Sequence, residues 1–265
     1  MLNKYRPTAY KNNHNITKES HLAVLGKYIA VIFVILFGIF IIFEGVAYYA
    51  VNYMPLKKEA ELFGDIDLGL GRTNPKQTEY VQKVLDKINP NDFKYKVQVV
   101  CDDDFNAFAL MGGKIYILSG LLKKIDNENE LSFVLAHEMS HIKNRDVMKQ
   151  VISNMPVQIM YVLFAGAPVN VDGLNNAIRM PFSKEVEIKA DTKALEIMHK
   201  KYDHVDGALS FLNKTDKEYL SFLTTFSDHP STKSRKMNVQ KIIKKNGYKN
   251  GEVVGVDKVL MGSCQ

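Results

Sequence analysis

Leu131-Ser-Phe-Val-Leu-Ala-His137-Glu138-Met-Ser-His141-Ile142 is an H-E-x-x-H pattern set among apolar residues. The apolar positions recur at steps of three and four residues, which predicts a helix that begins after Asn127, a typical capping residue. On a helix, His137 and His141 share one face and are close enough to hold one metal ion. Glu138 then stands beside them as a base that takes a proton from water. The alternative is a chance match on an ordinary amphipathic helix, because the pattern fixes only three residues.

The composition is that of an ordinary globular protein. The chain has 265 residues, enough for one sizeable domain and an accessory segment. Its net charge of +6 comes from lysines spread along the chain. Because no nucleic-acid-binding motif accompanies them, we expect a solvated surface and no nucleic-acid partner. Cys101 and Cys264 lie far apart without a C-x-x-C pattern, which predicts neither a zinc knuckle nor a disulfide framework.

The strongest break in composition is the apolar run from Tyr28 to Val51, in which Glu44 is the only charged residue. As a helix, this run is roughly 36 Å long, enough to cross the core of a bilayer. The alternatives are a buried helix of a soluble protein and a cleaved signal peptide, but the run is very apolar and no A-x-A cleavage site follows it. We therefore expect residues 28–51 to be a transmembrane anchor in contact with the lipid bilayer.

Charges on the two sides of this run predict its orientation. The basic residues before it are Lys4, Arg6, Lys11, Lys18 and Lys27. After it, Lys57 and Lys58 are followed by the acidic residues Glu59, Glu61, Asp65 and Asp67. Because basic residues stay on the cytoplasmic side, we expect residues 1–27 to be a cytoplasmic arm. Residues 52–72 are then a tether, residues 73–250 an extracytoplasmic domain on the periplasmic side of an inner membrane, and residues 251–265 a tail.

The segments before the central helix predict a helix, a strand and a hairpin. Asn74-Pro75 opens an amphipathic helix, and the residues from Phe93 to Cys101 alternate in polarity as a half-buried strand does. From Asn106 to Ile117, two short apolar runs flank a glycine pair, which is the pattern of a β-hairpin. Such a strand either offers a free edge to an extended peptide or belongs to an ordinary core hairpin.

After the central helix, the residues from Val151 to Val169 are apolar and uncharged. They do not predict a second membrane span, because a single crossing would separate His137 and His141 from every later residue. We expect this segment to be part of the core, or a flap that lies on the membrane surface near the cleft.

A further helix is predicted to begin near Phe182, and it carries the acidic residues Glu185, Glu187 and Asp191. A carboxylate is the expected third ligand where two imidazoles already bind zinc, and both glutamates are available. The alternative is a charged face exposed to solvent.

Four blocks of sequence together resemble the HtpX and CAAX prenyl endopeptidase family of membrane-associated zinc metallopeptidases, which are gluzincins. The matching blocks are Asn106-Ala107-Phe108 with Gly112-Gly113, Leu135 through His141, Ser183 through Asp191, and His229-Pro230-Ser-Thr with Arg235. The resemblance implies an α+β fold, a mainly helical zincin-like domain with a small β-sheet or hairpin, preceded by one transmembrane helix.

The same resemblance implies particular site residues. It implies one Zn²⁺ per chain, held by His137, His141 and Glu187, and it thereby selects Glu187 over Glu185. It also implies that Asp191 hydrogen-bonds a ligand imidazole and sets its tautomer.

In the first of these blocks, we expect the strand with Asn106, Ala107 and Phe108 and the turn at Gly112 and Gly113 to form the edge that holds the substrate.

His229 is implied to lie near the cleft, where it donates to the transition state or covers the metal, although a helix-capping role is an equal alternative.

The sequence departs from the family at two places. Lys184 stands where the family usually has arginine, and residues 144–146 lack a histidine often found there; we expect neither to touch a metal ligand. The basic stretch from Ser231 to Lys249, which includes Arg235, is expected to be a helix with a solvated face, with anionic lipid as an alternative contact.

The predicted function is zinc-dependent hydrolysis of peptide bonds in polypeptides, in the quality control of misfolded membrane or envelope proteins. One competing interpretation is a catalytically inactive, chaperone-like peptide-binding module on the same fold. The presence of Glu138 argues against it. A multi-spanning enzyme whose site faces the cytoplasm is the other alternative, and the single convincing span argues against that.

Overall fold

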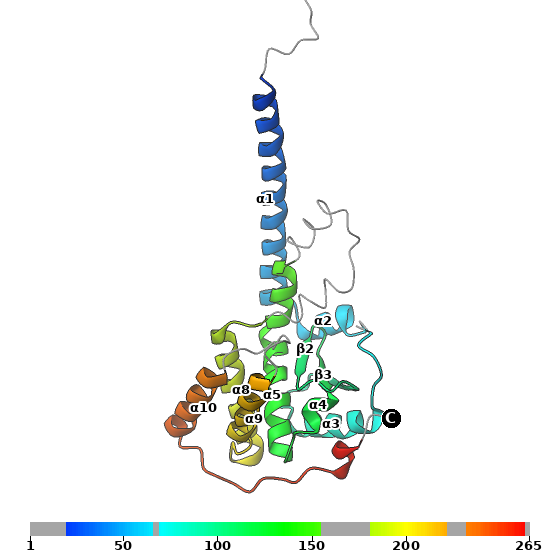
Figure 1. The fold of residues 1–265 in the computed structure, drawn as a ribbon, viewed down its shortest axis with the longest axis vertical. Helices are drawn as coiled ribbons and strands as arrows, with labels where there is room; N and C mark the ends of the chain where they lie inside the picture. Colours follow the sequence, from blue (N-terminus) through cyan, green and yellow to red (C-terminus); the bar gives the residue numbers. More distant parts are fainter. Residues whose placement is uncertain (1–19, 66–68, 155–180, 222–231, 263–265) are drawn as a thin grey trace, which may run out of the picture. The chain divides into compact units, whose positions relative to one another are not determined.

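The computed structural model describes residues 20–65, 69–154, 181–221 and 232–262 (Figure 1). His229 and most of the apolar segment from Val151 to Val169 lie outside the described residues, so the predictions made for them stay predictions. The chain divides into two compact units, Met1–Ile42 and Phe43–Gln265.

The helix α1 (His21–Tyr53) contains the apolar run that the sequence singled out. Among the described residues, it is the helix that is long and apolar enough to cross a membrane. Most of its large apolar side chains are exposed, as a lipid-facing helix requires. The predicted N-terminal apolar helix is therefore present.

Three strands form a small sheet in the second unit: β1 (Lys96–Val100), β2 (Ala107–Leu110) and β3 (Lys114–Leu118). Their order is β1-β3-β2, with β1 parallel and β2 antiparallel to β3. The hairpin is where the sequence predicted it. The first strand is shorter than the predicted run from Phe93 to Cys101, because the carbonyl oxygens of Phe93 and Tyr95 accept hydrogen bonds from side chains of Asn89 and Gln82 rather than from a neighbouring strand.

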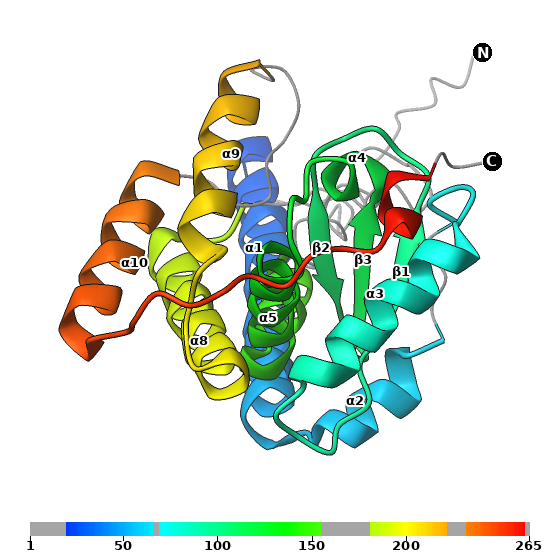
Figure 2. The same cartoon turned by 90° about the horizontal axis from the view of Figure 1, so that it is seen from below.

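Helices make up most of the rest of this unit. They are α2 (Leu56–Phe63), α3 (Pro75–Ile88), α4 (Ser119–Leu122), α5 (Glu128–Asn144), α8 (Lys184–Tyr202), α9 (Ala208–Ser221) and α10 (Thr232–Asn246), with a 3₁₀ turn η1 (Lys258–Met261). The helix α3 packs on β1, and α8 lies between α5 and α10 (Figure 2). A mainly helical fold with a small sheet is the predicted α+β class.

The two edges of the sheet differ in their hydrogen-bond partners. On the outer edge of β1, the N–H groups of Val97 and Val99 donate to the side chains of Gln82 and Thr78 on α3, at 2.9 and 3.0 Å. Those bonds close this edge to another strand. The strand β2 forms the other edge and packs on α5.

The described part of the C-terminal tail is an extended segment that crosses the unit from α10 to α3 (Figure 2). Val254 accepts from the N–H of Glu128 at 2.8 Å and donates to the side chain of Asn129 at 2.8 Å, both at the start of α5. The Gln77 side chain on α3 donates to the carbonyl oxygen of Leu260 at 3.1 Å. The tail thus holds the start of the central helix against α3.

One expectation from the cysteine spacing is wrong. Cys101, the residue after β1, is disulfide-bonded. Spacing along the chain does not reveal which cysteines meet in space, because the fold brings distant residues together. Cys264 lies outside the described residues.

Candidate active site

The central helix α5 places the H-E-x-x-H residues inside the domain. It begins at the predicted cap, where the Asn127 side chain accepts from the N–H of Glu130 at 2.9 Å. It ends where Arg145 adopts a left-handed conformation, with φ at 62°. Almost every residue between these ends is buried, polar ones included. Buried polar side chains require partners, so the surroundings of His137 and His141 decide what the helix can do.

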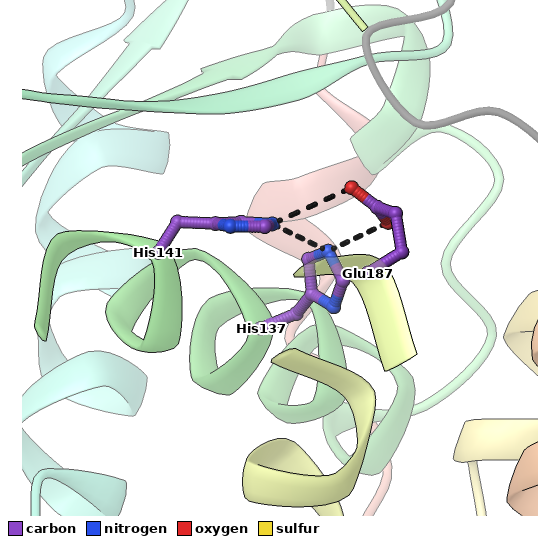
Figure 3. Close-up of side chains that lie close together, drawn as sticks. All are labelled: His137, His141 and Glu187. Atoms are coloured by element: carbon purple, nitrogen blue, oxygen red, sulfur yellow. Dashed lines mark hydrogen bonds and ion pairs between the residues drawn. The ribbon is translucent and has the colours of Figure 1, made fainter. Parts of the chain in front are cut away.

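Two imidazoles and one carboxylate meet at one point, as Figure 3 shows. The Nε2 atoms of His137 and His141 lie 3.0 Å apart. One oxygen of Glu187, on α8, lies 3.4 Å from Nε2 of His137, and the other lies 3.7 Å from Nε2 of His141. All three residues are buried. Glu185, the alternative ligand left open by spacing, is exposed.

This cluster, which we call the cage (His137, His141 and Glu187), fits a zinc ion. Both Nδ1 atoms face carboxylates, at 3.0 Å for His137 and 2.9 Å for His141, and an ionised carboxylate only accepts hydrogen bonds. In the neutral form of each ring, Nδ1 therefore carries the proton, and the two Nε2 lone pairs point at one another. Two ligand atoms of one tetrahedral zinc lie roughly 3.3 Å apart, close to the separations in the cage. A cation there relieves the repulsion between the lone pairs and the carboxylate.

Asp191 is the carboxylate that faces His137, and Arg235 holds it. The Arg235 guanidinium donates to both oxygens of Asp191, at 2.9 and 2.6 Å, and pairs with Glu187 at 3.1 Å. Its Nη2 also lies 3.4 Å from Nδ1 of His137, but the nearer carboxylate sets the tautomer. All of these side chains are buried. Arg235 thus fixes two acidic groups of the site at once.

The electrostatics of this group follow from its burial. Burial alone would raise the pKa of Asp191, but the charge and hydrogen bonds of Arg235 hold that pKa below its usual value. Burial and the charge of Arg235 oppose protonation of His137, yet the carboxylates of Asp191 and Glu187 outweigh both and raise its pKa to about 9. A metal ion bound at Nε2 of His137 would have to displace this proton.

Asp146 is the carboxylate that faces His141, and sequence reasoning missed it. The expectation that residues 144–146 touch no ligand is wrong, because Asp146 Oδ2 lies 2.9 Å from Nδ1 of His141. Burial and the charge of Glu187 raise the pKa of Asp146 to about 6. The Phe182 ring stacks on the His141 ring, with centroids 4.4 Å apart. The signal that could have found Asp146 is its position five residues after His141, one turn further along the chain.

The environment of Arg235 also differs from the prediction. The prediction of a solvated face for the basic C-terminal helix is wrong at this residue, which is only 6% exposed. Lys233 and Lys236 beside it are more accessible. Composition alone does not separate one buried arginine from its exposed basic neighbours, because the difference arises from the two carboxylates that meet it.

The remaining predicted site residues are placed as follows. Glu138 is buried next to His137, and its negative charge helps to raise the pKa of Arg235. Ala107 and Phe108 lie on β2 and Asn106 immediately precedes it. Gly112 and Gly113 form the turn of the hairpin, both with positive φ. These positions put the predicted substrate strand beside α5, the helix that carries the histidines.

The sequence is similar to known proteins over a range that includes the residues of this site. The sequence model of peptidase family M48 matches residues 72–243. The mitochondrial metalloendopeptidase OMA1 of Schizosaccharomyces pombe is 30% identical over 174 residues, which cover 60% of this chain and 50% of that protein. The metalloprotease LoiP of Escherichia coli is 26% identical over 192 residues, 66% of this chain and 75% of that protein.

A shorter match joins this chain to the beta-barrel assembly-enhancing protease of Yersinia pestis, which is 35% identical over 80 residues. These residues cover 29% of this chain and 16% of that protein. The chain spans about half the length of the OMA1 relatives that it matches.

Proposed function

Because this chain belongs to peptidase family M48, a membership that confirms the resemblance seen in its sequence, we propose that it is a membrane-anchored zinc endopeptidase. The observation that carries the proposal is the cage, two imidazoles and a carboxylate that converge inside the domain with a glutamate beside them. Three protein ligands that leave a fourth position open are the pattern of a catalytic zinc site.

The residues of the site have separate tasks in this proposal. His137, His141 and Glu187 would hold one zinc ion per chain, which supplies a lowered pKa for water and polarises the substrate carbonyl. Glu138 removes the proton from the attacking water and delivers it to the nitrogen of the departing amine. Asp191 and Asp146 keep the proton of each ligand imidazole on Nδ1, so that both Nε2 atoms stay available as ligands.

The proposed substrate is an extended stretch of polypeptide that lies along β2. The position of β2 supports this choice, because β2 packs on α5 while the opposite edge of the sheet is closed by α3. An added strand gains backbone hydrogen bonds that do not depend on side chains. Such binding suits an enzyme that acts on unfolded membrane or envelope proteins, the substrates that we propose here.

Two observations support an extracytoplasmic domain. Basic residues are concentrated before α1, as the positive-inside rule requires of a cytoplasmic N-terminus. Cys101 is disulfide-bonded, and disulfides persist in oxidising compartments outside the cytoplasm. We infer a single-pass protein whose catalytic domain lies on the periplasmic side of an inner membrane.

The decisive test is Glu138→Gln in the full chain. The amide keeps the shape of the side chain but cannot accept a proton, so cleavage of an unfolded protein should fall by about 10²–10⁴-fold. Zinc content should not change, because residue 138 is not a ligand. The matched control is Glu185→Gln, an exposed glutamate on α8 that should cleave at the wild-type rate.

Cleavage by Glu138→Gln at the wild-type rate would refute this mechanism. If wild-type protein that is loaded with zinc binds unfolded polypeptide without cleaving it, the chain is instead the peptide-binding module named above.

A further inference from the structure

Two charged residues outside the cage are buried against one another. Glu59 lies on α2, the first helix after α1, and Arg145 caps the end of α5; they are 2% and 8% exposed. Arg145 Nη1 and Glu59 Oε2 form an ion pair. A buried ion pair adds little net stability compared with apolar residues of similar size, but it fixes the segments that it joins.

Three segments meet at this pair. Arg145 Nη2 donates to the carbonyl oxygen of Met54, the residue that follows α1, at 2.5 Å. The N–H of Gly112, in the hairpin turn between β2 and β3, donates to Glu59 Oε1 at 2.8 Å. The pair therefore joins the segment after α1, the end of the central helix and the hairpin that carries the predicted substrate strand.

Gly112 shows how closely the hairpin turn approaches α2. Its φ is 80°, and a Cβ atom there would lie 2.6 Å from the backbone nitrogen of Gly64. It would also lie 2.7 Å from the carbonyl carbon of Phe63, the last residue of α2. Only glycine allows this contact between two backbones. The hairpin and α2 are thus in contact through backbone atoms as well as through Glu59.

The same pair is connected to His141 of the cage through one peptide bond, to Asp146, and one hydrogen bond. Arg145 adopts the left-handed conformation, which ends α5 and turns the chain into the helical residues 146–154. The next residue is Asp146, whose carboxylate lies 2.9 Å from Nδ1 of His141. A non-glycine residue adopts this conformation at a cost, so the contacts of its side chain help to hold it.

We propose that Glu59 and Arg145 are positioning residues that set His141 for metal binding. Glu59 holds the Arg145 side chain, the Arg145 turn places Asp146, and Asp146 orients the imidazole. Through this path the helix that follows the membrane anchor contributes to the metal site. The inference rests on the proposed function for its purpose, but zinc affinity tests it without any measurement of proteolysis.

The experiment compares zinc affinity in full-length protein, measured by competition with a coloured chelator. Glu59→Gln keeps the volume of the side chain and removes its charge, and we expect zinc affinity to fall about tenfold, as when a partner of a ligand is lost. The matched control is Glu79→Gln, which removes the charge of an exposed pair with Lys83 on α3 and should leave zinc affinity unchanged. If Glu59→Gln fails to fold, Glu59→Asp, which keeps the charge but shortens the reach, takes its place.

A double variant separates positioning from general loss of stability. If Glu59 acts through Asp146, then Glu59→Gln combined with Asp146→Asn should bind zinc as Asp146→Asn alone does. Losses that multiply in the double variant, or a zinc affinity of Glu59→Gln within twofold of the wild type, would overturn the inference. Failure of the proposed function would look different, since zinc affinity would follow this pattern while wild-type protein cleaved nothing.

Discussion

The two histidines of the cage are held in different ways. Asp191, which faces His137, is fully buried. It accepts hydrogen bonds from Arg235, which lies on a separate helix 44 residues further along the chain. Asp146, which faces His141, is 16% exposed and lies five residues from its histidine. Two ligands of one proposed ion therefore depend on two kinds of support, one made by the tertiary fold and one made by a local turn.

This difference has an electrostatic consequence. The positive charge of Arg235 keeps the pKa of Asp191 below its usual value, whereas burial and the charge of Glu187 raise the pKa of Asp146 to about 6. Asp191 is thus held in place without a metal ion, because Arg235 already supplies the opposite charge. On the His141 side, a cation bound in the cage would offset the charge of Glu187 that acts on Asp146.

The largest expected effect comes from removing the cation of the His137 side. Arg235→Met leaves Asp191 and Glu187 buried without its charge, so the unfolding free energy of the zinc-free protein should fall by about 3–5 kcal/mol. Urea denaturation in detergent measures this. Lys233→Met, at an exposed position of the same helix, is the control and should change the value by no more than about 0.5 kcal/mol. An equal loss in both variants would show that Arg235 has no special part.

A smaller effect is expected at the carboxylate that Arg235 holds. Asp191→Asn replaces an acceptor with an amide, which weakens both the bond to His137 and the pair with Arg235. Zinc affinity, measured with a competing chelator, should fall by about 10–100-fold, towards the upper end of the range for such partners. Unchanged zinc affinity would mean that the tautomer of His137 does not depend on Asp191.

The smallest effect is expected on the His141 side. Asp146→Asn should lower zinc affinity by about tenfold, because its carboxylate is partly exposed and solvent can replace part of its role. The same chelator assay allows direct comparison with Asp191→Asn. A greater loss for Asp146→Asn than for Asp191→Asn would reverse the ranking of the two supports.

The sequence predicted those features that depend on local pattern. The apolar period and the Asn127 cap predicted α5, and its helical geometry alone places His137 and His141 on one face. The apolar run predicted α1, and the glycine pair predicted the hairpin between β2 and β3. For the third ligand, spacing left Glu185 and Glu187 open, and the family resemblance selected the one that lies in the cage.

Apart from Asp146, which lies only five residues from His141, the features that were missed depend on contacts between distant residues. Arg235 looked like one basic residue among many, and its burial became visible only where α10 meets α8. Glu59 looked like part of a polar tether, yet it pairs with Arg145 inside the domain.

By itself, then, the sequence determined the central helix, the apolar N-terminal helix and the two histidines proposed as metal ligands, because periodicity and capping act over a few residues. The family resemblance pointed to Asp191, and only the tertiary structure showed that Arg235 and Asp146 complete the support of these histidines. The reason is that burial turns a charge into a group that must be paired, and the partner is whichever opposite charge the packing of the helices brings within reach.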